Sequence, residues 1–157
     1  MKYIFTLTII LILTSQCFSQ TKKPLYSLSA ETPKTIHKDG KTLWTVKTKL
    51  TNKTKDTLFY FSTTCSEQGY YSIDTNALYI DFQKCNTDQQ NVIKIAPKGS
   101  RTLDLEITSF KPVTASVPFR IVMFLFKAKD INDRMPIETL FKSKESMTFV
   151  WSDQLKT

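Results

Sequence analysis

Apolar and polar residues alternate with a period of two through most of the chain, which predicts β-strands. The clearest run lies within residues 43–62, where four residues fall on one face of a strand: Trp44, Val46, Thr48 and Leu50. Polar or small residues occupy the positions between them. Because successive side chains of a strand point to opposite faces, this run predicts a strand with one buried side.

The rest of the same segment predicts a turn followed by a second strand. Residues 52–56 are polar turn formers, and residues 57–61 return to β-branched and aromatic types. The second strand is apolar on both faces, so its register against the first is ambiguous. Leu50 could face either Leu58 or Phe59, and a slip of one residue would exchange the core and solvent faces. Asn52 also begins an N-glycosylation triplet, at a turn where it would be accessible.

The same patterns predict strands elsewhere in the chain. Six more are expected over residues 25–28, 77–83, 92–95, 102–108, 119–126 and 148–151, and shorter candidates lie at 70–73 and 139–141. Residues 35–37 lead into a turn. In two of the six strands the expected inward residues are Leu78, Ile80 and Phe82, and Leu103, Leu105 and Ile107. Asp39-Gly40 predicts a hairpin. Pro97 and Gly99 predict a turn in which the glycine takes the positive φ.

Eight or nine short strands without a helical period predict an all-β domain, either a two-sheet antiparallel sandwich or a small barrel. Two stretches carry a resemblance, VKTKLTNKTKDTL at 46–58 and IAPKGSRTLDLEI at 95–107. They resemble immunoglobulin-like modules of small exported bacterial proteins, and the composition resembles Bacteroidetes-type sequences. The resemblance implies an Ig-like sandwich and implies no activity.

The N-terminus has the pattern of an export signal. Lys2 precedes an apolar run over residues 4–13, and Cys17-Phe18-Ser19 is a small-x-small cleavage site. We therefore expect a signal peptide over 1–19 and a single domain over 20–157, located outside the cell, in the periplasm or in the cell envelope. Cys17 leaves a second reading open, the lipid-modified cysteine of a lipoprotein, although Gln16 stands where a small residue is expected.

After cleavage at that site, only Cys65 and Cys85 remain. An even number of cysteines in an oxidising compartment predicts a disulfide between them. Two free thiols and a metal site are the alternatives. A structural zinc site requires four ligands, and the chain contains one histidine, so we expect no metal and no cofactor.

The formal net charge of +8 is concentrated near the start of the domain. Residues 22–55 hold nine lysines against Glu31 and Asp39, whereas the charges after residue 55 cancel. Such a basic edge could attract anionic lipid or acidic glycans, or it could simply protect a sheet edge from aggregation. Export argues against nucleic acid. We expect peripheral membrane association only if Cys17 is lipidated.

The sequence offers little for catalysis, and we expect no enzyme. His37 is the only histidine and lies beside a predicted turn. Calcium could use the acidic turns near Asp74 or Asp130, but neither has the spacing of a known loop. Asp104 and Glu106 share an outward face without a predicted cleft.

Aromatic side chains provide the remaining candidate site. The tyrosines that could line a platform for sugars or a protein are Tyr60, Tyr70, Tyr71 and Tyr79. Core packing is the alternative for at least half of them. The candidate binding residues are Tyr70 and Tyr71, near the 63–76 loop, and Lys47 and Lys49 on the basic edge.

The function expected from the sequence is an exported, non-enzymatic interaction module of the envelope or the extracellular space, with an unknown protein or glycan partner. A proteinaceous inhibitor of secreted hydrolases is the first alternative, and protruding loops would favour it. A carbohydrate-binding module is the second, and a pocket would favour it.

Overall fold

A computed structural model describes residues 23–38, 41–82, 89–113, 115–136, 139, 142 and 147–157. The strands are β1 Tyr26–Ala30, β2 Lys34–Lys38, β3 Lys41–Asn52, β4 Leu58–Thr63, β5 Tyr71–Ile73, β6 Leu78–Asp81, β7 Gln90–Ile95, β8 Ser100–Ser109, β9 Pro118–Phe119, β10 Ile121–Phe126, β11 Met147–Trp151 and β12 Leu155–Lys156. A short 3₁₀-helix, η1 Glu67–Tyr70, precedes β5. The leader at 1–19, including Cys17, and Cys85 lie outside the described residues.

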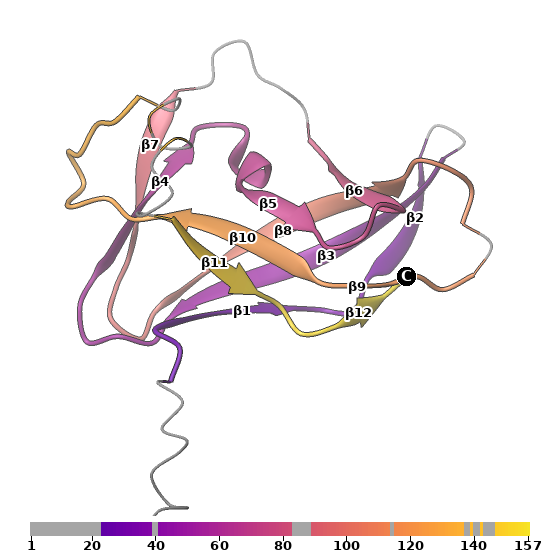
Figure 1. Cartoon of the computed structure of the whole chain (residues 1–157), viewed down its shortest axis with the longest axis horizontal. Helices are drawn as coiled ribbons and strands as arrows, with labels where there is room; N and C mark the ends of the chain where they lie inside the picture. The colour runs from indigo at the N-terminus through magenta and orange to yellow at the C-terminus, as the bar shows by residue number, and fades with distance from the viewer. Residues whose placement is uncertain are drawn as a thin grey trace, which may run out of the picture.

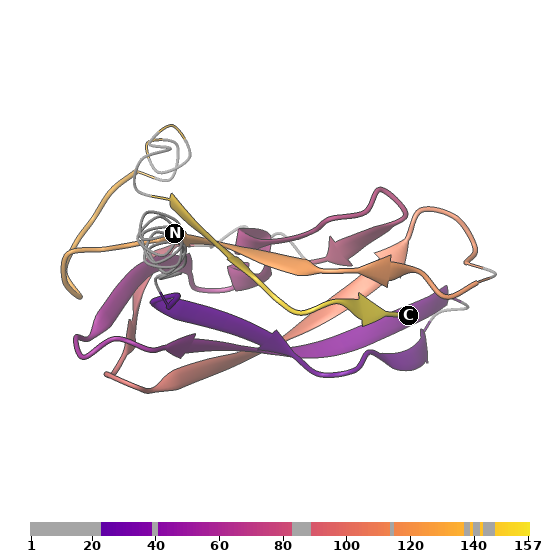
Figure 2. The same cartoon turned by 60° about the horizontal axis from the view of Figure 1, so that its bottom comes forward.

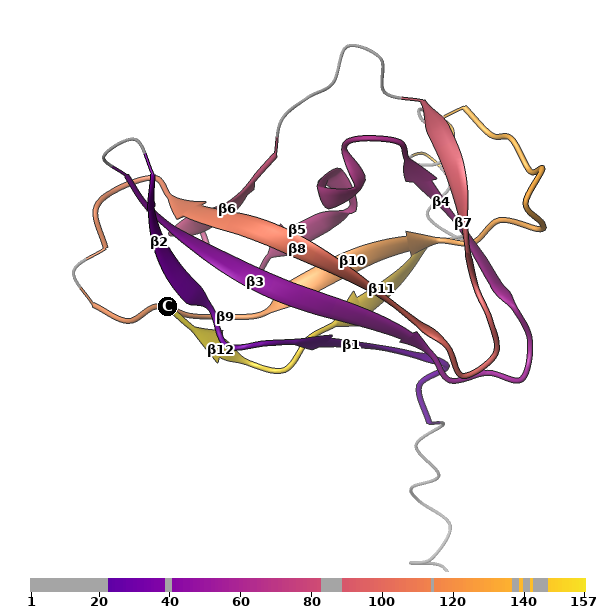
Figure 3. The same cartoon turned by 180° about the vertical axis from the view of Figure 1, so that it is seen from behind.

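The first layer is an antiparallel sheet in the order β1-β3-β8-β6, with β2 also paired to β3 (Figure 3). β1 pairs with residues 48–52 of β3, and β2 pairs with residues 41–45. Together they form one interrupted edge strand. Pro33 lies at the interruption, where its missing N–H breaks the ladder. The register of β2 on β3 confirms the expected hairpin, because Lys38 faces Lys41.

The second layer contains β10 at its centre. β11 pairs with one side of β10, and β5 pairs with the other. On the same side as β5, β4 is joined to the chain just after β10. The joint consists of a β-bridge between Tyr60 and Lys127 and a 2.9 Å hydrogen bond from the Ala128 N–H to the Phe59 carbonyl. β7 then pairs with β4. Figure 2 shows this layer over the first, with β10 and β11 above β1 and β3.

The core lies between the two layers. Residues from both inner faces are fully buried: Val46, Leu105, Ile107, Ile121 and Leu125. Burying each such side chain stabilises the fold by about 1.5–3 kcal/mol. The alternation predicted for residues 44–50 and 103–107 is confirmed. The chain is an all-β, two-sheet antiparallel sandwich of Ig-like layout.

The predicted pairing of the two strands in 43–62 is wrong. β3 belongs to the first sheet and β4 to the second, so neither Leu58 nor Phe59 faces Leu50, and the question of register does not arise. The physical reason is the composition of β4. A strand that is apolar on both faces is suited to a covered position, and the chain crosses between layers to reach it (Figure 1).

Asn52 holds this crossing in place. The side chain is fully buried, and Nδ2 donates to the carbonyls of Asp56, Ile95 and Ala96 at 2.8, 3.3 and 3.2 Å. Oδ1 accepts from the Thr54 N–H at 3.0 Å. Asn52 therefore ends β3 and joins the β3–β4 crossing to the end of β7, and it is not an accessible glycosylation site.

The turn after β7 differs in one detail from its prediction. The positive φ belongs to Lys98, at 59°, and not to Gly99. Gly99 is needed for space, because a Cβ there would lie 3.0 Å from the Ala96 carbonyl oxygen, which accepts the Gly99 N–H. The glycine thus permits a close backbone approach.

Four other expectations need correction. Phe82 lies just beyond β6 and is 38% exposed, so it does not point inward. The polar loop at 63–69 contains the start of η1. Thr139 is helical, whereas a strand was expected there, and Leu140 and Phe141 lie outside the described residues. The short β12, which pairs with β9, was not predicted.

Candidate functional site

The two tyrosines predicted to form a binding face lie in the core. Tyr70 is 4% exposed and packs edge-on against Phe126, with ring centroids 6.1 Å apart. Tyr71 is 7% exposed. Rings buried in this way cannot present a platform to a ligand, so the structure does not support the predicted aromatic face.

Lys47 and Lys49 are exposed on the outer face of β3, as expected. Lys47 lies opposite Asp104 on β8, and Lys49 lies opposite Thr102. Glu106 lies two residues after Asp104 on β8 and is paired with Asp81 on the neighbouring strand β6. The basic stripe on β3 therefore has an acidic stripe beside it, and this sheet face is not uniformly positive.

The other candidates for chemistry take part in local contacts. His37 is exposed on β2, and its Nδ1 lies 3.4 Å from the Thr42 hydroxyl. Asp74 accepts two hydrogen bonds from Arg120, one from the backbone N–H at 2.6 Å and one from Nε at 2.8 Å. Partial burial of Asp74 opposes its ionisation, but these two donors and the Arg120 charge outweigh it and lower the pKa of the carboxyl.

A partly buried ionic cluster that the sequence did not reveal joins the two sheets. Glu67 on η1 is 8% exposed and forms a two-pronged ion pair with Arg101 on β8, with oxygen–nitrogen distances of 3.0 and 2.7 Å. The Tyr60 hydroxyl donates to Glu67 at 3.2 Å. The cluster joins β4, η1 and β8, and its contacts occupy both carboxylate oxygens.

The surroundings keep the tyrosines of this cluster protonated. Burial raises the pKa of Tyr60 and of Tyr71 well above its ordinary value, and the Glu67 charge adds to both shifts. The hydrogen bonds to Glu67 raise the pKa of the Arg101 guanidinium further. A carboxylate held by a guanidinium is a poor general base, so we interpret this cluster as a tie between the sheets.

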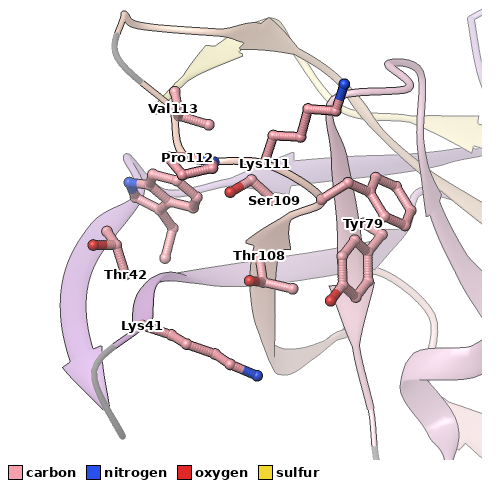
Figure 4. A pocket seen from close by; sticks show the side chains of 10 residues that line it. Lys41, Thr42, Tyr79, Thr108, Ser109, Lys111, Pro112 and Val113 are labelled. Atoms are coloured by element: carbon pink, nitrogen blue, oxygen red, sulfur yellow. The ribbon is translucent and has the colours of Figure 1, made fainter.

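An open hollow of about 540 Å³ lies where β3, β6 and the segment after β8 meet. Ten residues line it: Lys41, Thr42, Trp44, Tyr79, Thr108, Ser109, Phe110, Lys111, Pro112 and Val113. Figure 4 shows the Lys41 side chain extending below Thr108 toward the side of Tyr79, with Pro112 and Val113 on the opposite rim. The described residues of the lining include two lysines, and none of these described residues carries a carboxylate.

The wall of this hollow is a pair of exposed aromatic rings. Tyr79 is 38% exposed and Phe110 is 68% exposed, and their ring centroids are 4.4 Å apart at an interplanar angle of 35°. A second hollow, of about 410 Å³, also includes both rings and reaches Phe82. The two rings therefore form a ridge with a hollow on either side.

Sequence reasoning found part of this site. Tyr79 was expected to face outward on its strand, and it does. Phe110 was missed because it lies just after β8, where the period-two alternation of a strand no longer predicts which side chains are exposed. Lys41 was recognised only as part of the basic edge. The pairing of β6 with β8, which brings Tyr79 opposite Thr108, could not be predicted from local pattern.

Comparison with known proteins leaves the function open. No family model matches the chain, and no curated protein matches it. Among solved structures, it is similar to the "Structure of WR4, a C.elegans MSP family member", at 11% identity and a TM-score of 0.38, covering 85% of this chain and 97% of that one. A superposition this loose carries no functional argument. Within the described residues, no helix is long and apolar enough to cross a bilayer.

Proposed function

We propose that this chain is an exported, non-enzymatic interaction module of the cell envelope or extracellular space, and that its partner is a glycan. The observation that carries the proposal is the exposed ridge of Tyr79 and Phe110 with a hollow on each side. Of the functions considered from the sequence, a carbohydrate-binding module is the one that a pocket favours.

The chemistry of the ridge suits a sugar. An exposed aromatic ring has an apolar face on which the C–H face of a sugar ring can lie, and nearby hydroxyls orient its polar edge. Thr42 and Ser109 supply hydroxyl groups at the rim of the hollow. Because Lys41 and Lys111 line it and none of its described lining residues is acidic, we expect an acidic sugar to bind more tightly than a neutral one.

A binding role is favoured over hydrolysis by the placement of the acidic residues. Asp81 on β6 is paired with Glu106 on β8, and Asp81 is exposed on the open face of the sheet. Neither residue lines either hollow. Glycoside hydrolysis requires one carboxyl on each side of the bond that is cleaved. We therefore expect the protein to bind a glycan without releasing reducing ends from it.

Export and the Cys65–Cys85 disulfide belong to the same proposal. The chain on both sides of 83–88 lies against the segment that holds Cys65. The Thr64 N–H donates to the Gln89 carbonyl at 2.9 Å, and the Phe82 ring lies 3.7 Å from the position of a Cβ on Gly69. Cys85 lies between these two anchors in sequence, and a bridge from it to Cys65 is part of the proposal.

The test is calorimetric titration of residues 20–157 with a panel of acidic and neutral oligosaccharides. The double variant Tyr79→Ala with Phe110→Ala should weaken binding about tenfold or more, because it removes both stacking surfaces. The matched control replaces two exposed aromatics on the other sheet, Phe149→Ser with Trp151→Ser, and should bind as the wild type does.

Two results would contradict this function. If no oligosaccharide in the panel binds, or if the control double variant weakens binding as much as the Tyr79 and Phe110 variant, the ridge is not the glycan site. If reducing sugar is released on incubation and the release disappears in Asp81→Asn, the protein is a hydrolase.

A further inference from the structure

A second exposed aromatic surface lies on the other sheet, along β11. Phe149 is 52% exposed and Trp151 is 44% exposed, and both point away from the core between the buried or half-buried residues of the strand. Across the ladder, Phe149 lies opposite Phe124 and contacts it edge-on, with ring centroids 5.6 Å apart. Exposed aromatics grouped on one strand are a typical sign of an interaction surface.

The start of the described chain extends this surface. Leu25, which is 57% exposed, lies in the same shallow hollow of about 440 Å³ as Tyr26, Lys127, Phe149 and Trp151. β1 runs alongside β11 at this edge of the sandwich (Figure 2). We call Leu25, Phe149 and Trp151 the β11 patch.

Cations border the patch and lie over its rings. The Arg120 guanidinium lies 4.8 Å from the centre of the Trp151 ring, and the Lys127 ammonium lies 5.0 Å from the centre of the Tyr26 ring. Lys23 is exposed just before the patch in sequence. Arg120 also pairs with Asp74, so Lys23 and Lys127 are the cations available to an anionic surface.

We propose that the β11 patch binds the surface of a lipid bilayer. Tryptophan and other aromatic rings favour the boundary between headgroups and acyl chains, and lysines at the edge of such a patch reach the phosphates. Exposed leucine and phenylalanine would enter the boundary region with them. This surface is separate from the glycan site, and the inference does not depend on the proposed function.

The place where the described chain begins favours the bilayer as the occupant. Residues 1–22 precede the described chain, which begins at Lys23, two residues before Leu25. If Cys17 carries a lipid, the six residues from it to Lys23 span at most about 20 Å, so the anchor would hold the patch against the membrane. The patch should also bind without the lipid, which differs from the expectation that membrane association requires Cys17.

The experiment uses residues 20–157, which include every strand and the whole core of the described structure. This protein is mixed with vesicles of phosphatidylcholine and phosphatidylglycerol at 3:1, and with vesicles of phosphatidylcholine alone, and the bound fraction is measured by sedimentation. Trp151 is exposed and Trp44 is buried, so a blue shift of tryptophan fluorescence reports Trp151 entering the boundary.

The wild type should sediment with the vesicles, more strongly with the anionic ones, and its fluorescence should be quenched by brominated lipid. Phe149→Ser with Trp151→Ser should lower the partition coefficient about tenfold or more. The matched control, Tyr79→Ala with Phe110→Ala, removes two exposed aromatics from the other sheet and should leave the partition unchanged. Quenching of the wild type needs no variant, so the inference remains testable even if a variant unfolds.

Three results would overturn the inference. The first is that the wild type binds neither kind of vesicle, and the second is that the control loses as much binding as the patch variant. The third is a dimer in sedimentation velocity that only the patch variant dissociates, which would make the patch an interface between two copies. Failure of vesicle binding leaves the glycan titration unaffected, because that site lies on β3, β6 and the segment after β8.

Discussion

Replacing Arg101 by methionine tests the interpretation of the partly buried ionic cluster. The substitution keeps most of the side-chain length and removes the guanidinium, so that, among the described residues, Glu67 keeps the hydrogen bond from the Tyr60 hydroxyl, at 3.2 Å. Arg101→Met should destabilise the fold, because it leaves a carboxylate that is 11% exposed without its cation. The double variant Glu67→Gln with Arg101→Met should be more stable than Arg101→Met alone, because no uncompensated charge remains.

The expected magnitude follows from the exposure of the two partners. Breaking a fully buried pair by removing one partner costs about 3–5 kcal/mol, whereas a surface pair is worth about 0–1 kcal/mol. The Arg101 side chain is 40% exposed and that of Glu67 is 11% exposed, so water already weakens the pair from one side. We expect Arg101→Met to cost about 2 kcal/mol, and the added Glu67→Gln change to restore about 1 kcal/mol.

Urea denaturation followed by circular dichroism measures these free energies, and the 2 kcal/mol loss corresponds to a Tm lower by roughly 8 °C for a domain of this size. Arg120→Met is the matched control, since its pair with Asp74 is 49% and 25% exposed, and it should cost about 1 kcal/mol or less. If Arg101→Met changes the free energy of unfolding no more than Arg120→Met does, the cluster does not tie the sheets together.

Three further predictions concern the fold. Asn52→Ala should cost about 2–3 kcal/mol in urea denaturation, because buried carbonyls lose their donor, and the isosteric Asn52→Asp should not rescue it. Burial and the neighbouring carboxylate raise the pKa values of Tyr60 and Tyr71 in the folded protein. Above pH 10 the unfolded chain loses these two protons while the folded protein keeps them, so the free energy of unfolding is at its full value below pH 10 and falls above it. The loss should be about 1.4 kcal/mol per pH unit for each tyrosine, and phenylalanine at both positions should flatten the decline in urea midpoint between pH 9 and 11. Intact mass before and after reduction should differ by the two hydrogens of a Cys65–Cys85 bridge, and an unchanged mass would contradict it.

The alternation of apolar and polar residues was sufficient to predict the fold class and most strands. Val46 and Leu105 lie in the core because a strand with one covered face has a fixed period of two. The Asp39-Gly40 turn was similarly informative, since its local chemistry sets the pairing of the strands on either side. In each case the information is local.

Pairing between distant segments could not be predicted in this way. Asparagine is typical of exposed turns, yet Asn52 is fully buried. Its Nδ2 donates hydrogen bonds to carbonyls more than forty residues away in sequence, which local pattern could not predict. Arg101 has the strand parity of Leu103 and Leu105, but its side chain is 40% exposed near the start of β8. Local pattern could not predict its ion pair with Glu67 on η1, because the two residues are 34 positions apart in sequence.

The tyrosines show the same limit for the site. Tyr70 and Tyr71 are adjacent in a polar region, which suggested an exposed platform, but η1 turns both into the core. The exposed pair instead consists of Tyr79 and Phe110, which are brought together because β6 lies beside β8. The period of one strand was enough to place Tyr79 on the outside, but its contact with Phe110 depends on the neighbouring strand, which local pattern does not give.

The two aromatic surfaces belong to different sheets, and this separation allows each proposed role to be tested without the other. The Tyr79 and Phe110 ridge depends on β6 and the end of β8, whereas the β11 patch depends on β11 and the start of β1. The ties made by Asn52 and Glu67 hold the two layers together without using either surface. A domain held against a bilayer through β11 would therefore leave the ridge free to bind a glycan, and each double variant serves as the control for the other.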